Sequence, residues 1–143
     1  MVQLRHAGST DIQRLTDFLT DNSMTTVGLQ KCIENFIIAV DDKGSWVGVA
    51  GYEMYGRSAL LRSVAVEKGS RNLGHGRALV EAVLAETRKQ GVRTVYLFTE
   101  SAEQYFKRLG FDPAERDQID PAVKSSPQFT ECCNTHRLMR RPL

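Results

Sequence analysis

The chain has 143 residues, of which 41% are apolar and 25% charged, and this is the composition of an ordinary globular protein. The formal net charge of +2 is too small to indicate nucleic acid as a main partner. The length predicts one domain, spanning residues 1–143, whose core needs neither disulfides nor a structural metal.

The cysteines and the pattern of apolar residues indicate the cellular compartment in which the protein works. Cys32, Cys132 and Cys133 form no Cys-x-x-Cys spacing, so the sequence indicates neither a disulfide framework nor a zinc site. A reducing compartment is the simplest interpretation. The N-terminus shows no basic stretch followed by an apolar run, and no apolar run is long enough to cross a bilayer. We therefore expect a cytoplasmic protein with no membrane partner and no metal.

The N-terminal half predicts a strand and a helix followed by three strands. Residues 2–5 fit a first strand. Thr10 and Gln13 have the spacing of a capping box, and apolar residues at helical period follow them to about residue 21. Residues 24–34 are ambiguous and fit a short helix. Three apolar runs joined by short turns then predict an antiparallel meander. They comprise residues 36–40, 46–54 and 60–66.

The C-terminal half changes to a helical period. Apolar residues predict a helix over about 76–90, stopped by Gly91, and a short buried strand over 95–98. Ser101 and Gln104 form a second capping-box pattern, which opens a helix ending at Leu109. The rest is poorly patterned, and two closing strands fit it. They are residues 129–133 and 137–139. The alternation of strands and helices implies a mixed sheet covered by helices.

The segment that carries chemistry begins where the apolar run 60–66 gives way to a glycine-rich turn and then to a helix. A helix start presents unpaired backbone N–H groups and the positive end of the helix dipole. Gly74 and Gly76 leave room for an anion, and Arg71 and Arg77 add positive charge. The segment therefore predicts either a phosphate-binding nest or a tight turn without a ligand. Its spacing matches neither the Walker loop nor the three-glycine dinucleotide motif.

Two blocks of this sequence resemble the GNAT acetyltransferase superfamily. The first is Arg71-x-x-Gly74-x-Gly76 after a strand that ends in Val64, Ala65 and Val66, which looks like the acyl-CoA signature. The second runs from the strand at 95–99 through Ala102 and Phe106 to Leu109, Gly110 and Phe111. The resemblance covers about residues 2–111. It implies the GNAT fold, an α/β (α+β) fold with a mixed central sheet of about six or seven strands flanked by about four helices.

The resemblance implies an N-acetyltransferase with acetyl-CoA as co-substrate. Val64, Ala65 and Val66 would pair with the pantetheine arm through their backbone. The turn would wrap the pyrophosphate through main-chain N–H groups, and Thr99 stands where many members carry a cofactor-contacting asparagine. The turn comprises Arg71, Asn72, Leu73, Gly74, His75, Gly76 and Arg77.

The resemblance leaves the acid for the departing thiolate unassigned. Many members carry a tyrosine in this role where this sequence has Phe106, and phenylalanine cannot donate a proton. Tyr105 is the neighbouring candidate, although a helical register turns its ring about 100° away from Phe106 and off the active face. Either Tyr105 or another acid serves, or the thiolate leaves unprotonated.

Glu53 and Arg62 are the candidate residues on the acceptor side. Direct transfer needs a neutral amine, so a bound ammonium must lose its proton to a carboxylate, a histidine or a water. If the preceding turn centres on Gly56 and Arg57, Glu53 lies opposite Leu60 and Arg62 projects from the same face. The two then form either a structural ion pair or a catalytic set. In that set Glu53 is a base or amine anchor and Arg62 clamps a substrate carboxylate.

Other titratable residues are weaker candidates. Glu100 stands at a helix entry, where a glutamate often serves only as a dipole partner. His75 lies inside the turn and should contribute its backbone more than its ring. His6 and His136 have no partners visible in the sequence, so we expect ordinary surface or loop residues.

Within the superfamily, residues 60–66, 99–106 and 126–129 look most like the arsenic-resistance N-acetyltransferases, a branch similar to amino-acid N-acetyltransferases. Cys132 and Cys133 would point to opposite faces of a strand, which disfavours arsenic chelation. We expect a small-molecule amine substrate resembling an amino acid, with arsenic or other toxic-compound resistance as one setting. A non-catalytic acyl-CoA-binding sensor or scaffold is the alternative. An exposed edge strand leaves a homodimer open.

Overall fold

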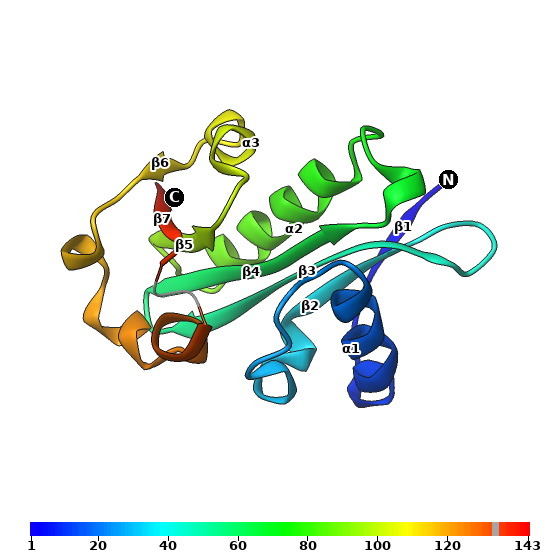
Figure 1. Cartoon of the computed structure of the whole chain (residues 1–143), viewed down its shortest axis with the longest axis horizontal. Coiled ribbons are helices and arrows are strands. Elements are labelled where there is room, and N and C mark those ends of the chain that lie inside the picture. Colours follow the sequence, from blue (N-terminus) through cyan, green and yellow to red (C-terminus); the bar gives the residue numbers. More distant parts are fainter. Residues whose placement is uncertain (133–134) are drawn as a thin grey trace.

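The computed structural model describes residues 1–132 and 135–143, the side chains of residues 131 and 132 excepted, and its seven strands form one mixed sheet (Figure 1). The order is β1-β2-β3-β4-β5-β7-β6, and every neighbouring pair is antiparallel except β4 and β5. The strands are β1 (Gln3–His6), β2 (Phe36–Val40), β3 (Trp46–Tyr55), β4 (Ser58–Val66), β5 (Thr94–Thr99), β6 (Asp112–Pro113) and β7 (Arg137–Pro142). The predicted mixed sheet and antiparallel meander are confirmed.

Three α-helices in the described residues cover the sheet (Figure 1). The helices α2 (His75–Lys89) and α3 (Glu103–Arg108) pack their apolar side chains on one face. On the opposite face, α1 (Ile12–Asp21) covers the N-terminal half of the sheet, and the segment 114–129 packs on β4, β5 and β7. That second face therefore carries two separate clusters. No helix in the described part of the chain is long and apolar enough to cross a membrane.

The central helix forms as the sequence predicts. Leu79, Val80 and Val83 recur at helical spacing and are fully buried against the sheet. The helix ends at Lys89, and Gly91 follows with a φ of +88°, a left-handed conformation that favours glycine. The predicted hairpin register is also confirmed, because Glu53 lies opposite Leu60 in the β3–β4 pair.

Both predicted capping boxes are wrong. The helix α1 begins at Ile12 after a 3-10 turn, and the Asp11 carboxylate accepts the backbone N–H of Gly8 at 2.9 Å. The helix α3 begins at Glu103, and the Thr99 hydroxyl accepts the backbone N–H of Ala102 at 3.0 Å. In both cases a side chain near the helix start accepts a backbone N–H group. It belongs to a different residue from the Thr10 or Ser101 that the spacing indicated.

The C-terminal segment departs most from the prediction. Gln128–Cys132 is a π-helical turn rather than a strand, because β7 occupies the place beside β5 along its whole length. Cys133 lies outside the described residues. The short strand β6 was not predicted because it contains Pro113, which an edge strand tolerates. The ambiguous segment before β2 forms two 3-10 turns, Leu29–Lys31 and Ile33–Asn35.

Candidate active site

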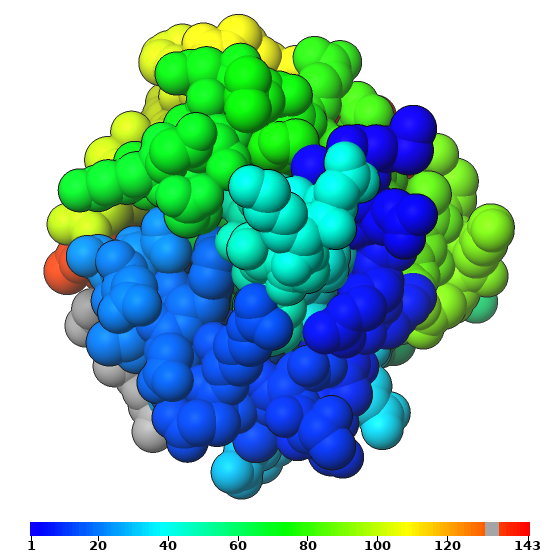
Figure 2. All heavy atoms as spheres, turned by 90° about the vertical axis from the view of Figure 1, so that its right-hand side faces the viewer, coloured from blue at the N-terminus to red at the C-terminus, as the bar shows by residue number. Residues whose placement is uncertain are grey.

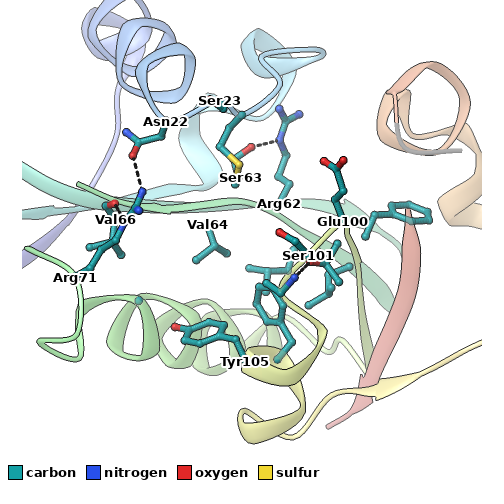
Figure 3. A pocket seen from close by; sticks show the side chains of 18 of the residues that line it. Asn22, Ser23, Arg62, Ser63, Val64, Val66, Arg71, Glu100, Ser101 and Tyr105 are labelled. Atoms are coloured by element: carbon teal, nitrogen blue, oxygen red, sulfur yellow. Dashed lines mark hydrogen bonds between the residues drawn. The ribbon is translucent and has the colours of Figure 1, made fainter. Parts of the chain in front are cut away.

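A cavity of about 780 Å³ opens where β4 and β5 separate (Figure 3). The two strands pair only from Ser58 and Thr94 to Leu60 and Tyr96. Beyond Leu60, no described strand pairs with β4 on its β5 side. The walls come from both strands, the start of α2, the helix α3 and the segment after α1. This volume lies in the range of small-molecule and cofactor sites.

A bulge in β4 turns that strand away from β5. Arg62 lies opposite Gly51 and Ala65 lies opposite Val49. Between these two pairs β4 has two residues, 63 and 64, where β3 has one, residue 50. Ser63, inside this interval, has a φ of +56°, which is uncommon for a residue other than glycine. Bulges bend the strand that carries them and re-aim its side chains. Arg62, Ser63 and Val64 consequently line the cavity.

One end of the cavity is the turn between β4 and α2. Asn72 and Gly74 have φ values of +66° and +86°, and the helix begins directly after Gly74. The Arg71 side chain donates to the carbonyl of Val66 at 2.9 Å and lies 3.5 Å from the Asn22 amide oxygen. Figure 2 shows this turn, in green, above the blue segment that follows α1. We call this region, residues 64–77, the cofactor end.

Most of the predicted cofactor residues line the cavity. They are Val64, Val66, Arg71, Asn72, Gly74, His75, Gly76, Arg77 and Thr99. Ala65 does not, because alternation along the strand places it in the cluster under α1. Leu73 does not either, and its side chain is 67% exposed at the tip of the turn.

Tyr105 lines the cavity, so the expectation that its ring points off the active face is wrong (Figure 3). A Cβ atom added to Gly76 would come within 2.5 Å of the Tyr105 hydroxyl oxygen. That hydroxyl therefore lies against the backbone at the start of α2. Burial raises the pKa of Tyr105, although Arg108 and Arg77 act in the opposite direction. Phe106 also reaches the cavity, but it is buried and packs edge-on against Phe111.

The other end of the cavity, which we call the acceptor end, lies between segments far apart in the sequence. Its walls are residues 23–25 after α1, Arg62 and Ser63 on β4, 98–101 at the end of β5, and Gln128 and His136. Figure 3 shows the segment after α1 and the turn Gln128–Cys132 on different sides of this opening. Side chains, rather than one backbone turn, therefore shape this end.

Arg62 and Glu53 form a buried ion pair behind the acceptor end. The Arg62 Nη1 and Glu53 Oε2 atoms are 3.0 Å apart, and the Arg62 side chain is fully buried. Nη1 also donates to the carbonyl of Val27 at 2.6 Å, and Nη2 lies 3.4 Å from the carbonyl of Thr25. The arginine thus holds the segment after α1 in place, and a carboxylate already neutralises it.

Glu53 does not line the cavity. Its second oxygen, Oε1, accepts the hydroxyls of Tyr55 and Ser126, each at 2.5 Å. Burial first, and this bond to Glu53 second, raise the pKa of Tyr55 to about 12. Burial raises the pKa of Cys32, which lies beside Arg62, to about 11. Glu53 therefore ties the C-terminal segment to the sheet, while Arg62 ties the N-terminal one.

Sequence reasoning missed one pair of residues at the acceptor end. His136 and Glu100 both line the cavity, with Nε2 and Oε2 3.8 Å apart. Glu100 directly follows β5 and His136 directly precedes β7, so they become visible as neighbours only once the β5–β7 register is known. Among the described residues, no group of three or more His, Cys, Asp or Glu is placed to hold a metal ion.

The strands β4 and β5 separate beside the start of α2, where Arg71 and Arg77 line the cavity. Such a site is suited to an elongated, phosphorylated ligand. The sequence model of the family described as "Acetyltransferase (GNAT) domain" matches residues 33–113, more than half of the chain. The chain belongs to this family and is an acetyltransferase of the GNAT type.

Individual relatives agree with the family. The chain is 28% identical over 142 residues to an uncharacterized N-acetyltransferase of Chlorobaculum tepidum, covering 94% of this chain and 86% of that protein. It is 29% identical over 100 residues to an amino-acid acetyltransferase of Pseudomonas fluorescens, covering 68% of this chain but 23% of that protein.

A solved structure shares the fold. It is N-acetylglutamate synthase from Neisseria gonorrhoeae, complexed with coenzyme A and N-acetyl-glutamate, with a TM-score of 0.85 at 18% identity. The match covers 100% of this chain and 35% of the synthase, so the chain corresponds to about a third of that protein.

Proposed function

We propose that the protein transfers the acetyl group of acetyl-CoA to the amine of a small amino-acid-like substrate. One observation carries the proposal: a single cavity connects the helix start at Gly74 with a separate polar end beside Arg62 and His136. Such a cavity has room for two ligands that meet near the β4 bulge. The likeness to an amino-acid acetyltransferase supports the acceptor class.

The residues at the cofactor end fit acetyl-CoA. The N–H groups at the start of α2, with Arg71 and Arg77 beside them, would hold the pyrophosphate. The edge of β4 at Val64 and Val66 would pair with the pantetheine arm, because no described strand occupies that side. Bound acetyl-CoA supplies the thioester whose acetyl group is transferred.

We propose Tyr105 as the acid for the departing thiolate. Its hydroxyl lies beside Gly76 and its ring lines the cavity. Because burial raises its pKa, the phenol keeps its proton at neutral pH and can donate it. The helix α3 thus offers a tyrosine one position before the one expected from the family pattern.

Glu53 and Arg62 are positioning residues in this proposal. Glu53 lies outside the cavity walls and has two hydroxyl donors on one oxygen, which disfavours it as the base. Arg62 needs no substrate anion to neutralise it, because Glu53 already does so. An acid group on the acceptor is therefore supported by the amino-acid acetyltransferase relative rather than by an unpaired arginine.

Release of free thiol tests the function. The protein is mixed with acetyl-CoA and, one at a time, the proteinogenic amino acids, their decarboxylated amines, and arsenic- and phosphorus-containing amino-acid analogues. The branch resemblance motivates the last group. We expect release that depends on an amino acid and is at least tenfold slower with its decarboxylated amine. Acetyl-CoA binding without amine-dependent release would instead favour the non-catalytic sensor.

A further inference from the structure

We propose that His136 is the base that takes the proton from the acceptor ammonium, with Glu100 stabilising the imidazolium that forms. This inference rests on the proposed function and deepens it at the same site. It assigns a role to two cavity residues that lie outside the cofactor motif and that the sequence did not bring together.

The sheet places the two residues side by side at the acceptor end. Thr99 and Arg137 form the last pair of the β5–β7 ladder. Glu100 directly follows β5 and His136 directly precedes β7, so the two residues come next beyond that pair. Both line the cavity where β5 has separated from β4. The distance of 3.8 Å between Nε2 and Oε2 exceeds that of a hydrogen bond but lies within the range of an ion pair once the ring carries a proton.

The charged groups around His136 come from four places, the end of β5, the turn after β6, β7 and α3. Glu100 faces the ring from the end of β5. Arg116 donates to the backbone carbonyl of His136 at 2.9 Å from the turn that follows β6. Arg137, the next residue on β7, lies 3.6 Å from the Glu103 carboxylate. The carboxylate beside the imidazole is thus Glu100.

The other titratable groups of the described cavity fit this role less well. Glu53 lies behind Arg62 and outside the walls. His75 is the first residue of α2 and therefore lies at the cofactor end. Tyr105 lies at the cofactor end beside Gly76. His136 is the imidazole at the acceptor end, and its side chain is 26% exposed, so it can exchange protons with water.

The step balances as a direct transfer. The imidazole of His136 takes one proton from the acceptor ammonium and becomes imidazolium. The freed nitrogen lone pair forms the N–C bond to the acetyl carbon, and the C–S bond of the thioester breaks. The bonding electron pair leaves on sulfur, and the thiolate takes a proton from Tyr105 or from water. The acetylated nitrogen, which still carries two protons, releases one of them, and that proton restores Tyr105 or neutralises the hydroxide left by water. His136 later returns its proton to solvent.

The test compares two histidines of one cavity, His136→Gln and the matched control His75→Gln. The acceptor is the amino acid that the wild-type protein acetylates fastest. We expect His136→Gln to lower kcat/KM at pH 7 about 100-fold, in the range of a lost general base, and to leave the Kd of acetyl-CoA unchanged. The rate of this variant should rise about tenfold per pH unit until the amine is neutral. His75→Gln should lack this pH signature. Glu100→Gln should lower the rate only a few-fold, because the carboxylate is 81% exposed.

A second acceptor separates proton removal from positioning. An α-aminooxy acid of the same side chain carries a nitrogen that is already neutral at pH 7. His136→Gln should acetylate it within about threefold of the wild-type rate. An equal loss on both acceptors, or no loss on either, would overturn the assignment while the proposed function stands. If the wild-type protein releases no thiol with any amine, the proposed function fails and the assignment fails with it.

Discussion

The cofactor end and the acceptor end of the cavity are built in opposite ways. The cofactor end is continuous in sequence, from Val64 to Arg77, and it offers mainly backbone groups at a strand edge and a helix start. The acceptor end draws side chains from residues 23–25, 62–63 and 98–101, and from Gln128 and His136. In the proposed function the first binds through the direction of its N–H groups, whereas the second depends on a buried network that holds distant segments together.

This difference predicts how each end responds to change. If the N–H groups of the cofactor turn bind the pyrophosphate as proposed, most side chains in that turn can vary provided that the backbone stays accessible. At the acceptor end, one buried pair, Arg62 and Glu53, is joined to both the N-terminal and the C-terminal segments. Losing one member of that pair should disturb both walls, so shape and stability are coupled there.

The largest effect should follow Arg62→Met, which leaves Glu53 buried and unneutralised. Breaking a buried pair by removing one partner costs about 3–5 kcal/mol of unfolding free energy. The bonds to Val27 and Thr25 are lost as well. Urea denaturation measures the change. Arg14→Met is the matched control, since Arg14 is exposed and packs over Trp46 at the surface, and it should cost less than about 1 kcal/mol.

A stable Arg62→Met protein would contradict the network as described. If it also showed a raised KM for the acceptor and an unchanged Kd for acetyl-CoA, Arg62 would contact the substrate directly. That result would restore the clamp that the sequence suggested.

The next largest effect should follow Gly74→Glu at the cofactor end. We expect the Kd of acetyl-CoA to rise about 100-fold or more, because the carboxylate would repel the phosphates at the helix start. Gly56→Glu is a matched control. Both glycines have a positive φ, +86° and +66°, and at both an added Cβ meets nothing within 4 Å. Calorimetry should therefore find weak binding for Gly74→Glu alone. Equal affinities in the two variants would place the phosphates elsewhere.

The same contrast explains what the sequence could predict. The cofactor end follows from local signals, namely an apolar strand, two glycines and a helix start. The Glu53–Leu60 register also followed from the position of one turn. The Glu100–His136 contact depends on which strand lies beside β5, and no local pattern specifies that. The ring of Tyr105 was predicted off the active face from the 100° step between neighbouring helix residues, whereas Gly76 leaves room for the tyrosine hydroxyl on the cavity side.

Tyr105→Phe tests the proposed acid for the departing thiolate and should lower kcat about tenfold. A lost general acid often costs more, but a thiolate leaves readily without protonation. The Kd of acetyl-CoA should stay within about twofold, because the ring is retained. Tyr52→Phe is the control, since the Tyr52 hydroxyl accepts a bond from Gln90 away from the cavity. If the two variants turn over equally fast, the thiolate leaves unprotonated or takes its proton from another group.

The smallest effect concerns Tyr55, at the edge of the acceptor-end network. Tyr55→Phe removes a bond to Glu53 but leaves Ser126 on the same oxygen, so about 1 kcal/mol of unfolding free energy should be lost at pH 7.

The pH dependence of the unfolding free energy shows whether the hydroxyl of Tyr55 accounts for the loss in Tyr55→Phe. Folding raises the pKa of Tyr55 from 10.0 to about 12, so its contribution to stability is present below pH 10 and disappears as pH rises to 12. Folding also raises the pKa of Cys32 from 9.0 to about 11, and that contribution disappears between pH 9 and 11. Wild-type stability should therefore fall from about pH 9 upward. In Tyr55→Phe the fall above pH 10 should be shallower, while the part due to Cys32 remains. Parallel stability curves for the two proteins above pH 10 would show that Tyr55 does not titrate with the Glu53 network.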